Sequence, residues 1–241
     1  MRLWIDTDIG DDPDDTVALW CAAQSSDAQL VGVSTVDGDV VGRAALAAAL
    51  LPGVEVNAGP PSAAQLATVD VLVGIGPWTH VAVLADAGAL PRRVVLMGGA
   101  LGRVLHRGAW HQVEHNVDRD PKSAARLLAT VGNLIVVPLD ATARLHAHPQ
   151  DEAVLVDAIP RFGEQLAAWR AAHGDVPLVL HDPATVLIWL GERIARMESR
   201  RLRVERDGTM HASIDGPVQH VVAHIDADAV RARVRALASK G

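Results

Sequence analysis

Six aspartates fall within ten positions near the N-terminus, at residues 6–15 of "WIDTDIGDDPDDTVAL". Carboxylates packed this densely repel one another, and each loses hydration if the segment is buried. A bound cation removes both costs, and oxygen donors without nearby cysteine or histidine select Ca²⁺ or Mg²⁺ over zinc. We therefore interpret the segment as a metal site, in which the turn at Gly10 brings Asp8, from a strand end, to Asp14 and Asp15, from a helix start.

Two alternatives compete with this interpretation. Asp14 and Asp15 also suit the first turn of a helix, where the helix dipole favours negative charge, but capping does not explain six aspartates. A metal in the site could lower the pKa of water and generate a nucleophile. Alternatively, Asp6 could attack a phosphoryl group, because "DTDIG" resembles the signature of haloacid-dehalogenase-like Mg²⁺ phosphatases. Gly10 stands where that signature has Thr or Val, and no downstream lysine and paired-acid motif stands out.

The elements that must position these residues alternate along the chain. Helical patterns separate short β-branched runs, which lie at residues 3–5, 30–36, 54–58, 69–75, 93–98 and 133–139. The helical patterns cover residues 14–24, 42–51, 79–87, 120–130 and 150–172. This alternation predicts an α/β fold with an open, mostly parallel, doubly wound, Rossmann-like sheet and helices on both faces.

The C-terminal part changes character. The segment "RLRVERDGTMHASI" predicts a small β-hairpin around Asp207-Gly208, followed by a strand near 219–225 and a final helix from about 226. Because no linker or repeat interrupts the pattern, we expect residues 1–241 to form one domain.

Polar residues collect where the predicted strands end. In open parallel sheets, ligands bind beyond the carboxyl ends of the strands. The residues at those ends are Asp6, Asp8, Asp37, Asp39, Gly76 to Thr79, Gly98-Gly99, Asp140 and His181-Asp182. The sequence thus places carboxylates and glycines along one rim of the sheet.

The composition limits the partners of the protein. A formal net charge of −7 without clustered Lys and Arg argues against a nucleic-acid surface, and no apolar run is long enough to span a membrane. The single cysteine, Cys21, excludes an intramolecular disulfide and indicates a reducing compartment. We expect a cytoplasmic protein that binds a small molecule.

Seven segments occur in the order typical of one known family. They are "DTDIGDDPDDTVAL", "VSTVDGDVVGRAALAAALL", "GIGPWTHVAVL", "VVLMGGA", "EHNVDRDPKSA", "VVPLDAT" and "HDPATVLIWL". Together they resemble the inosine–uridine-preferring nucleoside hydrolase family from about residue 3 to the C-terminal helix. The resemblance implies a Ca²⁺-centred α/β fold that cleaves the N-glycosidic bond of ribonucleosides to give ribose and a free base.

The resemblance also implies a metal site. Asp8, Asp15 and Asp182 would bind Ca²⁺ through their carboxylates, and Thr79 would bind it through its backbone carbonyl. The 2′- and 3′-hydroxyls of ribose would complete the coordination shell, as hard oxygens suit Ca²⁺. Asp8 would in addition act as the general base on a water molecule.

Five further residues receive roles from the resemblance. Asp14 and Asp39 would bind ribose hydroxyls, and Glu114 with Asn116 would hold the other polar edge of the sugar. His181 would donate a proton or a hydrogen bond to the departing base, a role that suits a side chain titrating near neutrality.

The sequence departs from the family pattern beside the expected site. His115 replaces Phe, and "HRGAWHQ" replaces the usual Gly-Asn before Glu114. Only 39 residues (40–78) separate Asp39 from Thr79, so a loop beside the base is missing. A larger substrate, a more open pocket or a partner subunit would each accommodate this loss, and we expect a homo-oligomer, a dimer or a tetramer.

Three hypotheses follow. The first is a Ca²⁺-dependent nucleoside hydrolase, the second a non-catalytic member of the family that binds ribosides, and the third a Mg²⁺ phosphatase. Trp110 and His111 are candidates to stack on a base, although an exposed loop with a packing tryptophan explains them equally well.

Overall fold

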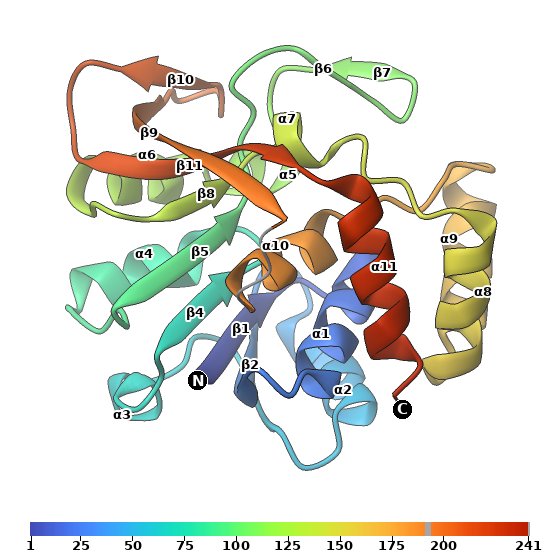
Figure 1. Cartoon of the computed structure of the whole chain (residues 1–241). Coiled ribbons are helices and arrows are strands. Elements are labelled where there is room, and N and C mark those ends of the chain that lie inside the picture. Colours follow the sequence, from blue (N-terminus) through green and yellow to red (C-terminus); the bar gives the residue numbers. More distant parts are fainter. Residues whose placement is uncertain (191–193, 241) are drawn as a thin grey trace.

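The computed structural model describes residues 1–190 and 194–240, in which a nine-stranded sheet is surrounded by helices (Figure 1). From one edge to the other, the strands are β10 (Met210–Ser213), β9 (Ala195–Val204), β11 (Val218–Ile225), β8 (Ile135–Val137), β5 (Arg93–Met97), β4 (Val71–Gly74), β1 (Arg2–Thr7), β2 (Gln29–Thr35) and β3 (Glu55–Ala58). Neighbours from β11 to β3 pair in parallel, whereas β9 pairs antiparallel with both β10 and β11. The predicted mostly parallel sheet and its C-terminal hairpin are therefore confirmed.

Helices cover both faces of the sheet. They are α1 (Asp14–Gln24), α2 (Val40–Leu50), α3 (Ala63–Leu66), α4 (Thr79–Asp86), α5 (His115–Arg119), α6 (Pro121–Thr130), α7 (Leu139–Thr142), α8 (Pro149–Ala158), α9 (Phe162–His173), α10 (His181–Trp189) and α11 (Ala227–Ala238). Within the described residues, none of them is both long and apolar enough to cross a membrane.

The alternation of side chains in β1 shows how the two faces are built. Leu3 and Ile5 pack into a core with α1, α10 and α11, whereas Trp4 packs into a second core with α4 and α6. Successive residues of a strand point to opposite faces, so a short run of large apolar residues supplies both cores. Because β1 is buried on both sides, the residues that follow it are held firmly at the rim.

Two local features differ from the sequence-based expectation. The helix predicted over 150–172 is divided into α8 and α9, because Pro160 has no backbone N–H and Arg161 adopts a left-handed conformation with φ of 60°. A short hairpin, β6 (Val104–His106) and β7 (Ala109–His111), was not predicted. Its two-residue turn at Arg107-Gly108 has positive φ at both positions, as a type I′ turn requires, but lacks the Asn or Asp that marks such turns in sequence.

Candidate active site

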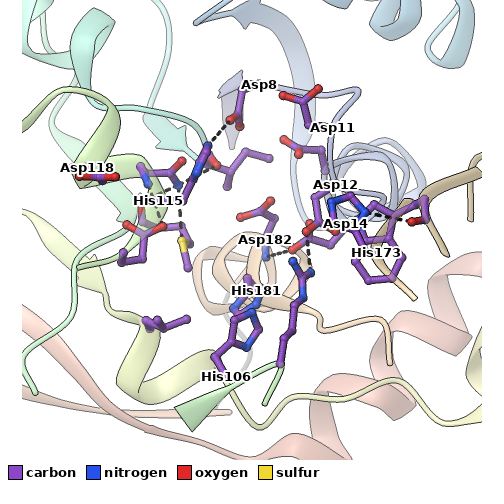
Figure 2. A pocket seen from close by; sticks show the side chains of 18 of the residues that line it. Asp8, Asp11, Asp12, Asp14, His106, His115, Asp118, His173, His181 and Asp182 are labelled. Atoms are coloured by element: carbon purple, nitrogen blue, oxygen red, sulfur yellow. Dashed lines mark hydrogen bonds and ion pairs between the residues drawn. The ribbon is translucent and has the colours of Figure 1, made fainter. Parts of the chain in front are cut away.

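A cavity of about 980 Å³ lies beyond the carboxyl ends of β1, β4 and β5 (Figure 2). Its walls come from the aspartate segment, the loop before α5, the hairpin β6–β7, α9 and the start of α10. These are ends of strands and helices that are far apart in sequence. The rim predicted from the strand ends is thus a place where many charged side chains converge.

Three carboxylates form the centre of this cavity. Asp14 and Asp15 begin α1 and Asp182 lies at the start of α10, and one oxygen of each lies within 4.8 Å of the others. All three side chains are buried. The backbone N–H of Asp182 donates to Asp14 over 3.2 Å, and the Thr7 hydroxyl donates to Asp15 over 2.5 Å. The two helices therefore hold their first-turn acids against one another.

The electrostatics of the cluster call for a cation. Burial raises the pKa of Asp14, Asp15 and Asp182 well above the ordinary value, and the neighbouring carboxylates raise it further. Burial is also the main reason why the pKa of Asp8 rises to about 7, although Arg43 opposes the shift. The donors are hard oxygens that have lost much of their water, so the residues present fit Ca²⁺ or Mg²⁺.

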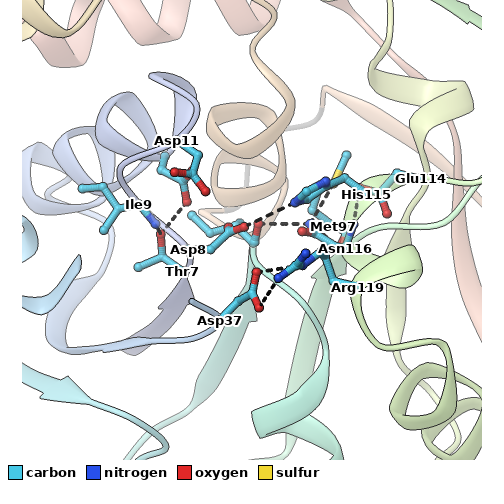
Figure 3. A network of polar contacts seen from close by, with 12 residues as sticks. Thr7, Asp8, Ile9, Asp11, Asp37, Met97, Glu114, His115, Asn116 and Arg119 are labelled. Carbon is cyan, nitrogen blue, oxygen red and sulfur yellow. Dashed lines mark hydrogen bonds and ion pairs between the residues drawn. The ribbon is translucent and has the colours of Figure 1, made fainter. Parts of the chain in front are cut away.

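Arg43 shapes the loop that carries Asp8. Its guanidinium is buried under the loop and donates to the backbone carbonyls of Asp8 and Ile9, while its other nitrogens bond Asp11 and the carbonyl of Asp37. The carboxylate of Asp8 is thereby left free to face the cavity. On that side Nε2 of His115, the histidine that replaces the family's Phe, lies 4.0 Å from Asp8 (Figure 3).

Gly76 lies against the same carboxylate, and Gly76→Ala is expected to damage the site. A methyl group there would lie 2.7 Å from Cγ1 of Val36 and 3.0 Å from both the backbone nitrogen and Oδ1 of Asp8. Val36 and Asp8 are both buried and have little room to move. We therefore expect a loss of about 1–3 kcal/mol in unfolding free energy. Urea unfolding measures the loss, and Gly102→Ala provides a control for the added methyl, because Gly102 is exposed, has no positive φ and would place the methyl 3.6 Å from its nearest neighbour, Oδ1 of Asp140. An unchanged unfolding midpoint for Gly76→Ala would contradict this packing.

Glu114 and Asn116 line the cavity opposite the acid cluster. Glu114 caps α5 and accepts hydrogen bonds from the backbone N–H groups of Gly99, Asn116 and Val117, at 2.7, 2.9 and 3.3 Å. The amide of Asn116 donates to the carbonyl of Ile75 over 3.1 Å. Both side chains are buried and rigidly held, so they present fixed polar groups to a ligand.

The geometry gives no support to two of the predicted site residues. Thr79 is the first residue of α4, so its carbonyl is in position to accept a backbone hydrogen bond within the helix. Its hydroxyl donates to Asp120 over 2.7 Å. The residue at the end of β4 that lines the cavity is Ile75. Asp39 caps α2 by accepting from the backbone N–H of Gly42 over 3.0 Å, and it does not line the cavity.

His181 begins α10 and lies between the acid cluster and the hairpin β6–β7 (Figure 2). Its Nδ1 is 2.7 Å from the hydroxyl of Thr142, and its ring centroid is 4.9 Å from that of His106. Burial lowers the pKa of His181 well below its usual value, and His106 and Arg107 lower it further. This direction differs from the expectation that the side chain titrates near neutrality, and it favours an uncharged ring.

The far end of the cavity is walled by the hairpin and α9. Arg107 in the hairpin turn pairs with Asp12 over 2.6 Å, and its guanidinium lies 4.8 Å from the centre of the Trp169 ring. The Trp169 and His173 rings are 5.3 Å apart. The sequence analysis singled out Trp110 and His111 of this wall but neither Arg107 nor Trp169. In the hairpin, His111 lines the cavity, whereas Trp110 points outward and is 61% exposed.

Comparison with known proteins identifies the family. The model of the inosine-uridine preferring nucleoside hydrolase family matches residues 55–232, about three quarters of the chain. The protein belongs to this nucleoside hydrolase family. Two uncharacterised proteins of Schizosaccharomyces pombe align with this nucleoside hydrolase at 27% and 28% identity, covering 79% and 86% of this chain and 80% and 81% of theirs.

Solved structures support the fold of this hydrolase along its whole length. The plant nucleoside hydrolase PpNRh1 superposes with a TM-score of 0.82 at 17% identity, covering 98% of both chains. The purine-preferring ribonucleoside hydrolase from Gardnerella vaginalis gives 0.79 at 19% identity, covering all of both chains. The aspartate segment before residue 55 lies outside the family match but within these superpositions.

Membership of the family leaves no role for the phosphatase hypothesis, and the position of Asp6 agrees with this. Asp6 is buried beneath the rim, where its Oδ1 accepts from the Ser34 hydroxyl over 2.5 Å and lies 3.0 Å from Nδ1 of His80. It does not line the cavity, so it cannot attack a substrate there. The chain is an enzyme of the nucleoside hydrolase class, and Asp6 supports the rim of its sheet.

Proposed function

We propose that this nucleoside hydrolase cleaves ribonucleosides to ribose and a free base in a Ca²⁺-dependent reaction carried out by residues 1–241 as one domain. The observation that carries the proposal is the convergence of Asp8, Asp14, Asp15 and Asp182 in one cavity of the size of a nucleoside site. A cluster of several carboxylate donors favours Ca²⁺, which takes about six to eight oxygen ligands in varied geometries, over Mg²⁺, which demands near-ideal octahedral geometry.

The acid cluster would serve the sugar. When bound, a divalent cation supplies positive charge for the ribose diol and lowers the pKa of a water molecule in the site. Asp8 accepts the proton of the attacking water, and Asp14 accepts hydrogen bonds from the ribose hydroxyls. Because the sugar becomes oxocarbenium-like in the transition state, the surrounding carboxylates also stabilise its developing positive charge.

The remaining walls would hold the rest of the nucleoside. Glu114 and Asn116 bind the polar edge of the sugar that faces away from the acids. The base lies toward His181 and the wall formed by α9, to which Trp169 and His173 contribute. The carbonyl of Ile75 takes the place that the resemblance assigned to Thr79 as a backbone ligand. Assembly into a dimer or tetramer stays a prediction.

The charge of the cavity predicts which substrates are rejected. Asp8, Asp11, Asp12, Asp14, Asp15, Glu114, Asp118 and Asp182 all line it, whereas Arg107 is the one lysine or arginine among its lining residues. A phosphate group on the substrate would be repelled at short range. We expect kcat/KM for nucleoside 5′-monophosphates to be at least about 100-fold below that for the matching nucleosides.

A reducing-sugar assay with a panel of ribonucleosides and their 5′-monophosphates, in Ca²⁺ and in a chelator, tests the proposal. Ribose release that requires Ca²⁺ supports it. If nucleosides raise the melting temperature but are not consumed, the chain is instead a non-catalytic riboside-binding protein. Equal turnover of nucleosides and monophosphates would contradict the electrostatic selection.

A further inference from the structure

The hydrogen bond between His181 and Thr142 is buried beside the cavity. Nδ1 of His181 lies 2.7 Å from Oγ1 of Thr142, the last residue of α7. Thr142 has no exposed surface, and the His181 side chain is also buried. Water is therefore not at hand to satisfy either group, and the direction of this one hydrogen bond must suit both partners.

Only one direction satisfies both groups. If Nδ1 carried the proton and donated, the threonine hydroxyl would need another acceptor for its own hydrogen. Across residues 1–190 and 194–240, Thr142 Oγ1 forms no other side-chain hydrogen bond. A buried hydroxyl without an acceptor keeps its full desolvation penalty. If the hydroxyl donates to Nδ1, both the hydroxyl and Nδ1 have a partner. The ring proton must then be on Nε2.

We propose that Thr142 is a positioning residue that fixes His181 as the neutral tautomer with its proton on Nε2. Nε2 makes no hydrogen bond to the described part of the chain, and His181 lines the cavity. The residue therefore offers a ready-made N–H to a ring nitrogen of the departing base, as a hydrogen-bond donor rather than as a charged acid. The inference rests on the proposed function, because a donor is needed there only if a base departs.

The surroundings of the ring agree with a neutral donor. His106 packs against the ring, with 4.9 Å between the two ring centroids. An imidazolium would also have to donate from Nδ1, which would again leave the Thr142 hydroxyl without an acceptor. The one hydrogen bond to Thr142 therefore determines both the tautomer and the neutral state of the ring.

The tautomer is observable directly by NMR of the protein labelled with ¹⁵N-histidine. The His181 signals are assigned by their loss in His181→Gln. We expect one protonated nitrogen, Nε2, and one bare nitrogen, Nδ1, near pH 7.5. Thr142→Val removes the hydroxyl at nearly constant volume and should shift His181 to a tautomer mixture, whereas Thr142→Ser should preserve the original tautomer.

Thr185→Val is the matched control. Thr185 is also fully buried, and its hydroxyl donates to the backbone carbonyl of the same His181 over 3.0 Å, one turn along α10. The Thr185→Val variant therefore loses a hydroxyl that bonds the backbone of His181 but not its imidazole ring. We expect the His181 tautomer in Thr185→Val to be that of the unaltered protein.

Kinetics link the tautomer to the leaving base. With Ca²⁺, Thr142→Val should lose about 10- to 100-fold in kcat for a ribonucleoside, the value of one buried hydrogen bond. For a nitrophenyl riboside, whose leaving group needs no donor, the loss should be less than about 3-fold. Thr142→Ser should restore most of the nucleoside activity, and Thr185→Val should leave the ratio of the two substrates unchanged.

Two results would overturn the inference. One is a proton on Nδ1 of His181 in the unaltered protein. The other is an equal loss on both substrates in Thr142→Val with the tautomer unchanged, which would make Thr142 a packing residue. If the unaltered protein releases no ribose from any substrate, the proposed function fails instead, and the NMR measurement still decides the tautomer.

Discussion

Asp182→Asn is expected to abolish Ca²⁺ binding and to lower kcat/KM for a ribonucleoside by more than about 10³-fold. The substitution removes one of the three carboxylates whose oxygens lie within 4.8 Å of one another, and it keeps the side-chain shape. A cation at the centre would lose both a ligand and a unit of compensating charge. Isothermal titration calorimetry with Ca²⁺ and the reducing-sugar assay measure the two losses.

The same substitution should stabilise the protein when no metal is bound. Burial and the neighbouring carboxylates raise the pKa of Asp182, so its ionisation near pH 7.5 is unfavourable. Asparagine carries no charge, and we expect the metal-free melting temperature to rise, with a gain of about 1 kcal/mol or more in unfolding free energy. Asp118→Asn, at an exposed position of the same cavity, should change neither the Ca²⁺ affinity nor the metal-free melting temperature. Normal Ca²⁺ affinity in Asp182→Asn would contradict the proposed metal site.

The second large effect is a dependence of stability on pH that changes sign when the metal binds. Folding raises the pKa of Asp8 from 3.8 to about 7, and the pKa values of Asp14, Asp15 and Asp182 rise as well. The folded protein then holds more protons than the unfolded chain, so its stability falls as pH rises from about 4 through 7. Each carboxyl group that must ionise costs up to about 1.4 kcal/mol per pH unit in this window.

With Ca²⁺ the slope should reverse. Metal ligands must be deprotonated, so affinity and the stabilisation that it brings increase with pH. Urea unfolding between pH 4.5 and 8, in a chelator and in excess Ca²⁺, measures both slopes. Asp8→Asn should make the metal-free dependence of stability on pH less steep, because it removes one of the four carboxyl groups that produce the slope. A metal-free protein that grows steadily more stable from pH 5 to 7.5 would show that these acids are not held in the repulsive arrangement described above.

The sequence predicted the sheet and the acidic half of the site because both follow from short-range patterns. β1 is a buried run of three large apolar residues, and whatever follows such a strand must emerge at the rim. Asp8, Asp14 and Asp15 lie within the next turn and helix start, so their convergence needs no knowledge of the rest of the chain. Asp182 was also placed at the rim, because it follows the apolar run "VPLVL", but its role as a metal ligand came only from the family resemblance.

The parts that sequence missed depend on exact register and on burial. Thr79 stands in a recognisable motif, yet β4 ends at Gly74, and Ile75 rather than Thr79 is among the residues that line the cavity. His181 was expected to titrate near neutrality, as an ordinary histidine does. Its actual surroundings, above all Thr142 and His106, could not be foreseen because they come from distant segments. The wall made by the hairpin β6–β7 and α9 was missed because its turn residues, Arg107-Gly108, carry a weak signal.

The contact between the starts of α1 and α10 has a consequence for how the chain folds. Asp14 and the backbone of Asp182 are 168 residues apart in sequence, so the loop that their meeting closes spans most of the molecule. Closing such a loop costs entropy that local contacts do not repay, and the chain must be largely assembled before the two segments meet. A cation held there cannot nucleate folding. It would join the first and last thirds of the chain only after most of the fold has formed, and we expect it to slow unfolding rather than to speed folding.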